Sequence, residues 1–186
     1  MEHSCPSTSL QHLQHFINDY LLADVALPHL LLYGSGGTGK RRATSYLIQQ
    51  MTLNSSVKKQ SGGDLPPWVL MIDCRTLVRV TSIVDPWSST MPESSEMDVI
   101  AHIVLFMKQQ VSAATYKQLK MVVMLNAEYM SFSLQSTLRR YVEIHSDTTR
   151  FVFVARNKSP IIKPLLSRVC QIFFKPTNYT TQKKPV

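Results

Sequence analysis

Short apolar runs alternate along the chain with stretches whose apolar residues recur three and four positions apart. The first pattern is typical of buried strands and the second of amphipathic helices. The apolar runs predict five strands, at residues 30–33, 68–73, 121–125, 151–155 and 169–174. The helical spacing predicts helices at residues 9–22, 39–51, 98–111 and 131–144, with a shorter helix or turn at 160–166. The expected buried face of the third helix is Ile100, Ile103, Val104 and Met107.

The alternation of strands with helices indicates an α/β fold, in which helices cover both faces of a mostly parallel five-stranded sheet. Two polar segments rich in Ser and Pro, at residues 54–67 and 84–96, are predicted loops. Ligands of such sheets bind beyond the carboxyl ends of the strands. We expect the loop after the first strand to meet the ends of the 121–125 and 151–155 strands there.

Length, charge and cysteine content limit the kinds of protein that this chain can be. A length of 186 residues fits one domain. The net charge of +8 favours a polyanionic partner, such as a nucleotide, a nucleic acid or an acidic protein surface, although a merely solvated basic surface is the alternative. The 3 cysteines form no Cys-x-x-Cys pair and the 6 histidines are scattered, so we expect a reduced, intracellular protein without a metal site. No apolar stretch approaches the roughly 18 residues of a membrane span.

The loop after the first strand carries the strongest chemical signal. Gly34, Gly39 and Lys40 match the phosphate-binding pattern G-x-x-x-x-G-K-[ST], but Arg41 replaces the final hydroxyl residue. The expected nucleotide-binding residues are Gly34, Ser35, Gly36, Gly37, Thr38, Gly39, Lys40 and Arg41. Backbone N–H groups and Lys40 can still hold the phosphates of ATP or ADP, but the usual hydroxyl ligand of Mg²⁺ is absent. A relic loop that keeps its glycines for a turn with positive φ is the alternative.

Three segments together resemble the AAA+ small subunits of the sliding-clamp loader, replication factor C. Residues 27–34 are similar to the family's approach to the P-loop, residues 135–143 to its QAALRRxxE helix, and residues 161–169 to the segment that ends in Ser-Arg-Cys. The resemblance implies a P-loop NTPase core of the AAA+/RecA type, with three layers. It places this core domain at residues 1–175, followed by a basic tail at 176–186 that could be disordered.

The resemblance also implies where the catalytic positions fall. The two Walker B carboxylates of the family fall on Leu125 and Asn126, so only Glu128 remains as a displaced base. Without the metal ligand and the base, phosphoryl transfer loses both of its usual supports. Arg41 and the altered Walker B segment are closest to the family's catalytically weak fifth small subunit.

Other family positions carry arginines. The sensor position falls on Arg156, with Asn157 beside it, and the Ser-Arg-Cys arginine that reaches a neighbouring subunit's nucleotide falls on Arg168. Arg139 and Arg140 are implied contacts to another subunit or to DNA, and solvated charge is the alternative for both. The family continues into a helical lid and a helical collar, which have no counterpart in these 186 residues.

The expected function is therefore that of a clamp-loader-like AAA+ module that does not hydrolyse ATP. It would support DNA replication or repair by docking onto partner subunits, the sliding clamp or DNA, and the family resemblance implies a nuclear location. Two alternatives stay open. One is an active P-loop NTPase or nucleotide kinase with rearranged metal ligands, and the other is a structural interaction protein that uses no nucleotide.

Overall fold

A computed structural model describes residues 11, 13–15, 17–19, 26–53, 66–77, 96–109 and 119–176. The strands are β1 (Leu30–Tyr33), β2 (Val69–Asp73), β3 (Lys120–Leu125), β4 (Thr149–Ala155) and β5 (Cys170–Phe173). The helices are α2 (Lys40–Leu53), α3 (Glu96–Lys108), α4 (Phe132–Ile144) and α5 (Lys163–Leu166), with short 3₁₀ turns η1 (Cys74–Leu77) and η3 (Ala127–Tyr129). Nearly all of the predicted loops at 54–67 and 84–96, much of the 9–22 helix and nearly all of the 176–186 tail lie outside the described residues.

The five strands form one sheet in the order β2-β3-β4-β1-β5, and every pair is parallel. The central strand β4 is buried at all seven of its residues, as expected for a strand covered on both faces. This arrangement confirms the predicted α/β fold with a parallel five-stranded sheet. It also brings the carboxyl ends of β1, β3 and β4 to one edge of the molecule.

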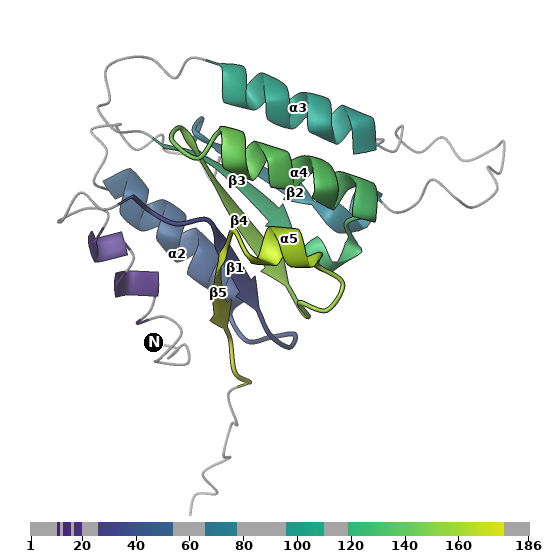
Figure 1. Ribbon diagram of the computed structural model, residues 1–186. Coiled ribbons are helices and arrows are strands. Elements are labelled where there is room, and N and C mark those ends of the chain that lie inside the picture. The colour runs from purple at the N-terminus through teal and green to yellow at the C-terminus, as the bar shows by residue number, and fades with distance from the viewer. Residues whose placement is uncertain are drawn as a thin grey trace, which may run out of the picture.

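Helices cover both faces of the sheet (Figure 1). Along β4, Phe151 and Phe153 face the core beneath α3, α4 and α5, whereas Val152 and Val154 face the core beneath α2. The described helical residues near the N-terminus, among them Leu13 and Ile17, pack into the second core as well. The alternation is the period of two that a strand imposes on its side chains.

Helix α3 differs in its buried face from the prediction. The structure buries Val99, Ile103 and Phe106, whereas Val104 is only partly covered. The segment is apolar on nearly every side, so the helical period alone could not distinguish the predicted buried face from the observed one. Both faces contain Ile103. The helix also begins earlier than predicted, at Glu96, whose carboxylate accepts a 2.8 Å hydrogen bond from Ser131 at the start of α4.

Candidate functional site

The loop between β1 and α2 has the backbone of a phosphate-binding loop. Gly37 and Gly39 adopt φ values of 77° and 86°, in the left-handed region that favours glycine. The loop leads directly into α2, a helix of 14 residues that begins at Lys40. Free N–H groups and the positive end of the helix dipole therefore face the space in front of the loop, which suits an anion.

Neighbouring atoms leave no room for a side chain at one glycine of this loop but not at another. A Cβ atom on Gly34 would lie 2.2 Å from the carbonyl oxygen of Phe174, because the end of β5 passes directly beside the loop. A Cβ atom on Gly36 would meet nothing within 4 Å. The sheet therefore requires Gly34, whereas no packing contact requires Gly36.

Lys40 is folded back into its own loop. Its Nζ atom donates hydrogen bonds to the carbonyl oxygens of Gly34 at 2.5 Å and Ser35 at 2.6 Å, and to the hydroxyl of Thr38 at 3.2 Å. Burial is the main cause that lowers the pKa of Lys40, while the nearby carboxylate of Glu128 opposes that shift. A phosphate that enters the loop would replace these carbonyls as the partner of the ammonium group.

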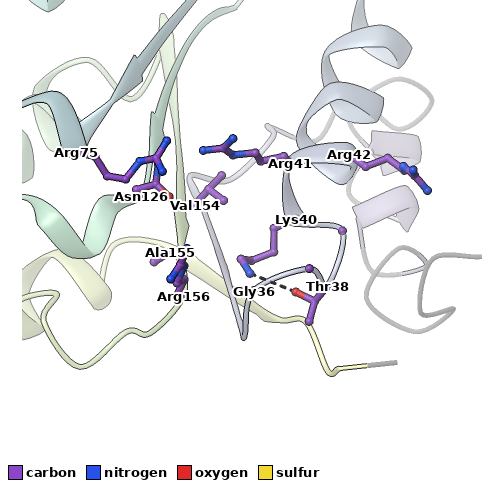
Figure 2. A pocket seen from close by; sticks show the side chains of 12 residues that line it. Gly36, Thr38, Lys40, Arg41, Arg42, Arg75, Asn126, Val154, Ala155 and Arg156 are labelled. Carbon is purple, nitrogen blue, oxygen red and sulfur yellow. Dashed lines mark hydrogen bonds between the residues drawn. The ribbon is translucent and has the colours of Figure 1, made fainter. Parts of the chain in front are cut away.

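A cavity of about 510 Å³ opens in front of the loop (Figure 2). Its lining comes from the loop and the start of α2, from the residues after β2 and β3, and from the end of β4: Gly36, Gly37, Thr38, Gly39, Lys40, Arg41, Arg42, Arg75, Asn126, Val154, Ala155 and Arg156. Five of these side chains are cationic and none is a carboxylate. The predicted meeting of the loop with the ends of the other two strands is thus observed, and the cavity is strongly suited to anions.

Asp73 is a carboxylate next to residues that line this cavity, and the sequence analysis does not single it out. Asp73, at the end of β2, accepts hydrogen bonds from Arg75 at 2.7 Å and from the side-chain amide of Asn126 at 2.7 Å. The Arg41 guanidinium lies 3.7 Å from the same carboxylate. The hydrogen bonds from Arg75 are the main cause that lowers the pKa of Asp73 to about 2. Its place at the carboxyl end of a parallel strand was the available signal, but the adjacency of β2 and β3 was needed to use it.

The segment after β3, where the family resemblance places the Walker B positions, takes part in these contacts. Leu125 packs partly against the core beneath α2, and Asn126 adopts a left-handed conformation with φ of 54°. Glu128 accepts a 3.2 Å hydrogen bond from the backbone N–H of Arg156, and its other carboxylate oxygen is buried without a hydrogen-bond partner among the described residues. Glu128 therefore lies behind the cavity wall, close enough to Lys40 to act on its charge.

The remaining candidate residues divide between the cavity and the surface. Arg156 lines the cavity, whereas Asn157 instead accepts hydrogen bonds from the backbone and hydroxyl of Ser159 in a turn. Arg168 donates to the carboxylate of Glu143 and lies outside the cavity lining. Arg139 and Arg140, on α4, are also absent from that lining.

The donor set does not fit a magnesium ion held in the usual P-loop manner. Mg²⁺ prefers oxygen ligands from hydroxyl groups, carboxylates and water in near-octahedral geometry. The position after Lys40 carries a guanidinium, and the carboxylate beside that guanidinium, Asp73, already accepts hydrogen bonds from Arg75 and Asn126. No group of three or more His, Cys, Asp or Glu side chains suited to a metal occurs in the described part of the chain.

Known proteins with similar sequences are replication factor C subunits. The chain is 30% identical over 150 residues to replication factor C small subunit 2 of Pyrobaculum islandicum, covering 81% of this chain and 38% of that protein. It is 24% identical over 163 residues to a putative replication factor C small subunit of Acanthamoeba polyphaga mimivirus, covering 84% and 42%. It is 28% identical over 150 residues to replication factor C subunit 4 of Caenorhabditis elegans, covering 80% and 38%. The chain therefore spans about two fifths of the length of these relatives.

Solved structures show the same core. A DNA polymerase III gamma subunit-related protein of Thermotoga maritima superposes with a TM-score of 0.57 at 15% identity, over 91% of this chain and 47% of that one. The RuvB Holliday junction branch migration motor of the same organism gives 0.58 at 13% identity, over 94% and 46%. The Aeropyrum pernix ORC1 protein, solved with DNA, gives 0.57 at 14% identity, over 91% and 45%. No protein-family model matches the chain.

Sequence and structure comparisons agree on the architecture. The relatives in sequence and the neighbours in structure both cover more than three quarters of the chain. None of the helices in the described ranges is long and apolar enough to cross a bilayer. The chain has the α/β core of the AAA+ P-loop ATPases, and its sequence is similar to that of replication factor C small subunits.

Proposed function

We propose that this chain is a clamp-loader-like AAA+ module that holds a nucleotide and does not hydrolyse it. One observation carries the proposal: the phosphate-binding loop and Lys40 open onto a cation-lined cavity that lacks the usual metal ligands and catalytic base. Binding and hydrolysis need different groups, and this site retains only the first set. The relatives named as replication factor C subunits give the cellular context.

The chemistry of phosphoryl transfer explains why binding does not lead to turnover. Hydrolysis requires a metal ion to bridge the phosphates and a group that orients and deprotonates the attacking water. Arg41 replaces the hydroxyl ligand, Leu125 is partly packed into the core, and Asn126 donates its amide to Asp73. Asn126 cannot accept a proton from water as a carboxylate would. We therefore propose ATP or ADP as the ligand and no catalytic residue in this chain.

The proposed partners follow from the relatives and from charge. In this proposal, residues 1–175 form the core domain, which docks onto AAA+ subunits, a sliding clamp or DNA during replication or repair. Arg168 is then a candidate finger for a neighbour's nucleotide, and Arg139 and Arg140 are candidates for a subunit or DNA contact. The net charge of +8 supports a polyanionic partner. We propose an intracellular and, in eukaryotes, nuclear location.

The first test is the binding of fluorescent ATP and ADP to the purified chain, with Lys40→Ala as the control, alongside a phosphate-release assay. The proposal expects binding that Lys40→Ala weakens and no phosphate release above background. Turnover at ordinary AAA+ rates that Lys40→Ala abolishes would contradict it. Failure of the wild-type chain to bind either nucleotide would instead support a structural protein, in which Lys40 permanently fills its own loop.

One observation favours an enzyme as the second candidate. Glu128 has a buried carboxylate oxygen without a hydrogen-bond partner among the described residues, and it lies near Lys40. If Glu128 rotated toward a bound phosphate, it could serve as a displaced base. The matched variant Glu128→Gln keeps the size of the side chain and removes its charge. Phosphate release by the wild type that Glu128→Gln abolishes, without loss of nucleotide binding, would favour this candidate.

A further inference from the structure

We infer that this site binds an oligophosphate chain without a divalent metal ion, and that Arg41 provides the positive charge which Mg²⁺ supplies in ordinary P-loop proteins. The inference rests on the proposed function, in so far as the phosphates enter the loop at Gly34–Lys40. It adds to that function the chemical state of the ligand: the free polyphosphate rather than its magnesium complex.

The charge around the cavity supports this assignment. Five cationic side chains line it, and the nearest carboxylates, Asp73 and Glu128, lie behind that lining. A nucleoside triphosphate carries several negative charges, which a metal ion ordinarily offsets in part. Here the protein itself can offset them, so that a metal ion is not needed to make binding favourable.

The two arginines near Asp73 have different roles. Arg75 is committed to Asp73 by hydrogen bonds of 2.7, 3.2 and 3.3 Å from its guanidinium. The Arg41 guanidinium lies 3.7 Å from that carboxylate, which is too long for a hydrogen bond. Figure 2 shows the Arg41 side chain directed toward Arg75 and Asn126, whereas the Arg42 side chain points the other way. Arg41 is thus oriented at the cavity with its donors available to a phosphate.

The chemistry of the guanidinium suits this task. Its planar fork donates two parallel hydrogen bonds to a phosphate group and never loses its charge near neutral pH. Arg41 follows Lys40 directly in the first turn of α2, and both residues line the cavity. A Mg²⁺ ion at this position would meet Arg41 and Arg75 at close range. The hydroxyl that ordinarily follows the P-loop lysine is absent, and the carboxylate of Asp73 is already committed to Arg75 and Asn126.

The test compares ATP binding in EDTA with ATP binding in excess Mg²⁺, by calorimetry on the full chain. We expect binding that is at least severalfold tighter in EDTA than in excess Mg²⁺, because Mg²⁺ complexes most of the ATP whereas the site takes the free polyphosphate. Arg41→Ser, which restores the P-loop hydroxyl, should weaken binding in EDTA about tenfold through the lost charge-assisted hydrogen bonds. Lys108→Ser removes a positive charge from the exposed surface of α3, away from the cavity lining, and should leave binding unchanged. Thermal melting of each variant confirms that it is folded.

The outcomes separate the inference from the proposed function. Binding that appears in Mg²⁺ and disappears in EDTA would overturn metal-free binding while leaving the nucleotide-holding function intact. Equal binding by wild type and Arg41→Ser in EDTA would overturn the role of Arg41. No binding under either condition would overturn both proposals. Competition by tripolyphosphate in EDTA identifies the source of the ligand. If tripolyphosphate displaces bound ATP as effectively as ATP itself does, the site takes a free polyphosphate, and if it displaces ATP less effectively, the site takes a nucleotide. Both results are consistent with metal-free binding.

Discussion

The side-chain amide of Asn126 donates a 2.7 Å hydrogen bond to the carboxylate of Asp73, joining the carboxyl ends of β3 and β2. The residue on which the family resemblance places a catalytic carboxylate is thus held by the neighbouring strand. Asp73 in turn is held by Arg75. Hydrogen bonds within the protein therefore engage the side chains of both Asp73 and Asn126.

Asn126→Asp should destabilise the protein by about 1–2 kcal/mol, because it replaces the donor with a second carboxylate beside Asp73. The measurement is urea unfolding near neutral pH. Asn126→Ala, which removes the hydrogen bond without adding charge, is the matched control and should cost less. Equal stability of the two variants would show that like-charge repulsion is absent. ATPase activity in Asn126→Asp is not expected, since Arg41 and Leu125 are unchanged.

Gly34→Ala should lower the free energy of unfolding by about 2 kcal/mol or more, because the new methyl group would overlap the backbone of Phe174, directly after β5. Gly36→Ala should leave thermal stability within about 0.5 kcal/mol of the wild type, since no atom lies near the added carbon. If the loop holds phosphate, Gly36→Ala should still weaken nucleotide affinity by crowding the ligand. A stable Gly34→Ala variant would contradict the close approach of Phe174.

Stability should fall as the pH is lowered from about 7.5 to about 5, by about 2 kcal/mol from one residue. Burial, assisted by the nearby Arg150, lowers the pKa of His29 from 6.5 to about 4. The unfolded state therefore binds a proton between these values that the folded state does not, so the stability is complete above pH 6.5 and declines below it. His29 Nδ1 accepts a 3.1 Å hydrogen bond from the backbone of Phe151, which protonation would abolish.

The comparison for that pH dependence is His29→Gln, whose side chain can accept a hydrogen bond and does not titrate. Urea midpoints measured across the same pH range should vary less in this variant than in the wild type. The other histidines are the same in both proteins, so their contributions cancel. If the urea midpoint changed with pH equally in both proteins, protonation of His29 would not lower the free energy of unfolding.

Arg168→Ala should change the free energy of unfolding by less than about 1 kcal/mol, because exposed ion pairs contribute little. The side chains of Arg168 and Glu143 are 29% and 44% exposed. A matched thermal melt of Glu143→Gln, which breaks the same pair from the other side, should give a similarly small change. A loss of several kcal/mol in either variant would make the pair a structural element and weaken the case for a finger.

The pattern of the chain predicted much of the fold because strands and helices differ in their periods. The pattern also predicts that the ends of β3 and β4 lie beside the loop, because the carboxyl ends of parallel strands lie at the same edge of a sheet. Asn126 and Arg156 are indeed found beside the loop. The predicted buried face of α3 was wrong at Val104. Most positions of this helix are apolar, so the helical period could not identify which of them face the core.

The contacts of Asp73 could not be predicted in the same way. They depend on the pairing of β2 with β3, although 46 residues separate Asp73, at the end of β2, from Lys120, at the start of β3. They also depend on the left-handed backbone of Asn126, which turns its amide toward the neighbouring strand. Likewise, the inward position of Lys40 follows from the shape of the loop rather than from its sequence pattern.

The contrast between Gly34 and Gly36 bears on how the history of this chain can be reconstructed. In a lineage that lost its ligand, purifying selection for folding alone would preserve the glycine beside Phe174. The glycine at the open tip of the loop would be released to drift. Descendants of one ancestor would then diverge first at Gly36, and that position would date the loss of binding more faithfully than the glycine that opens the loop.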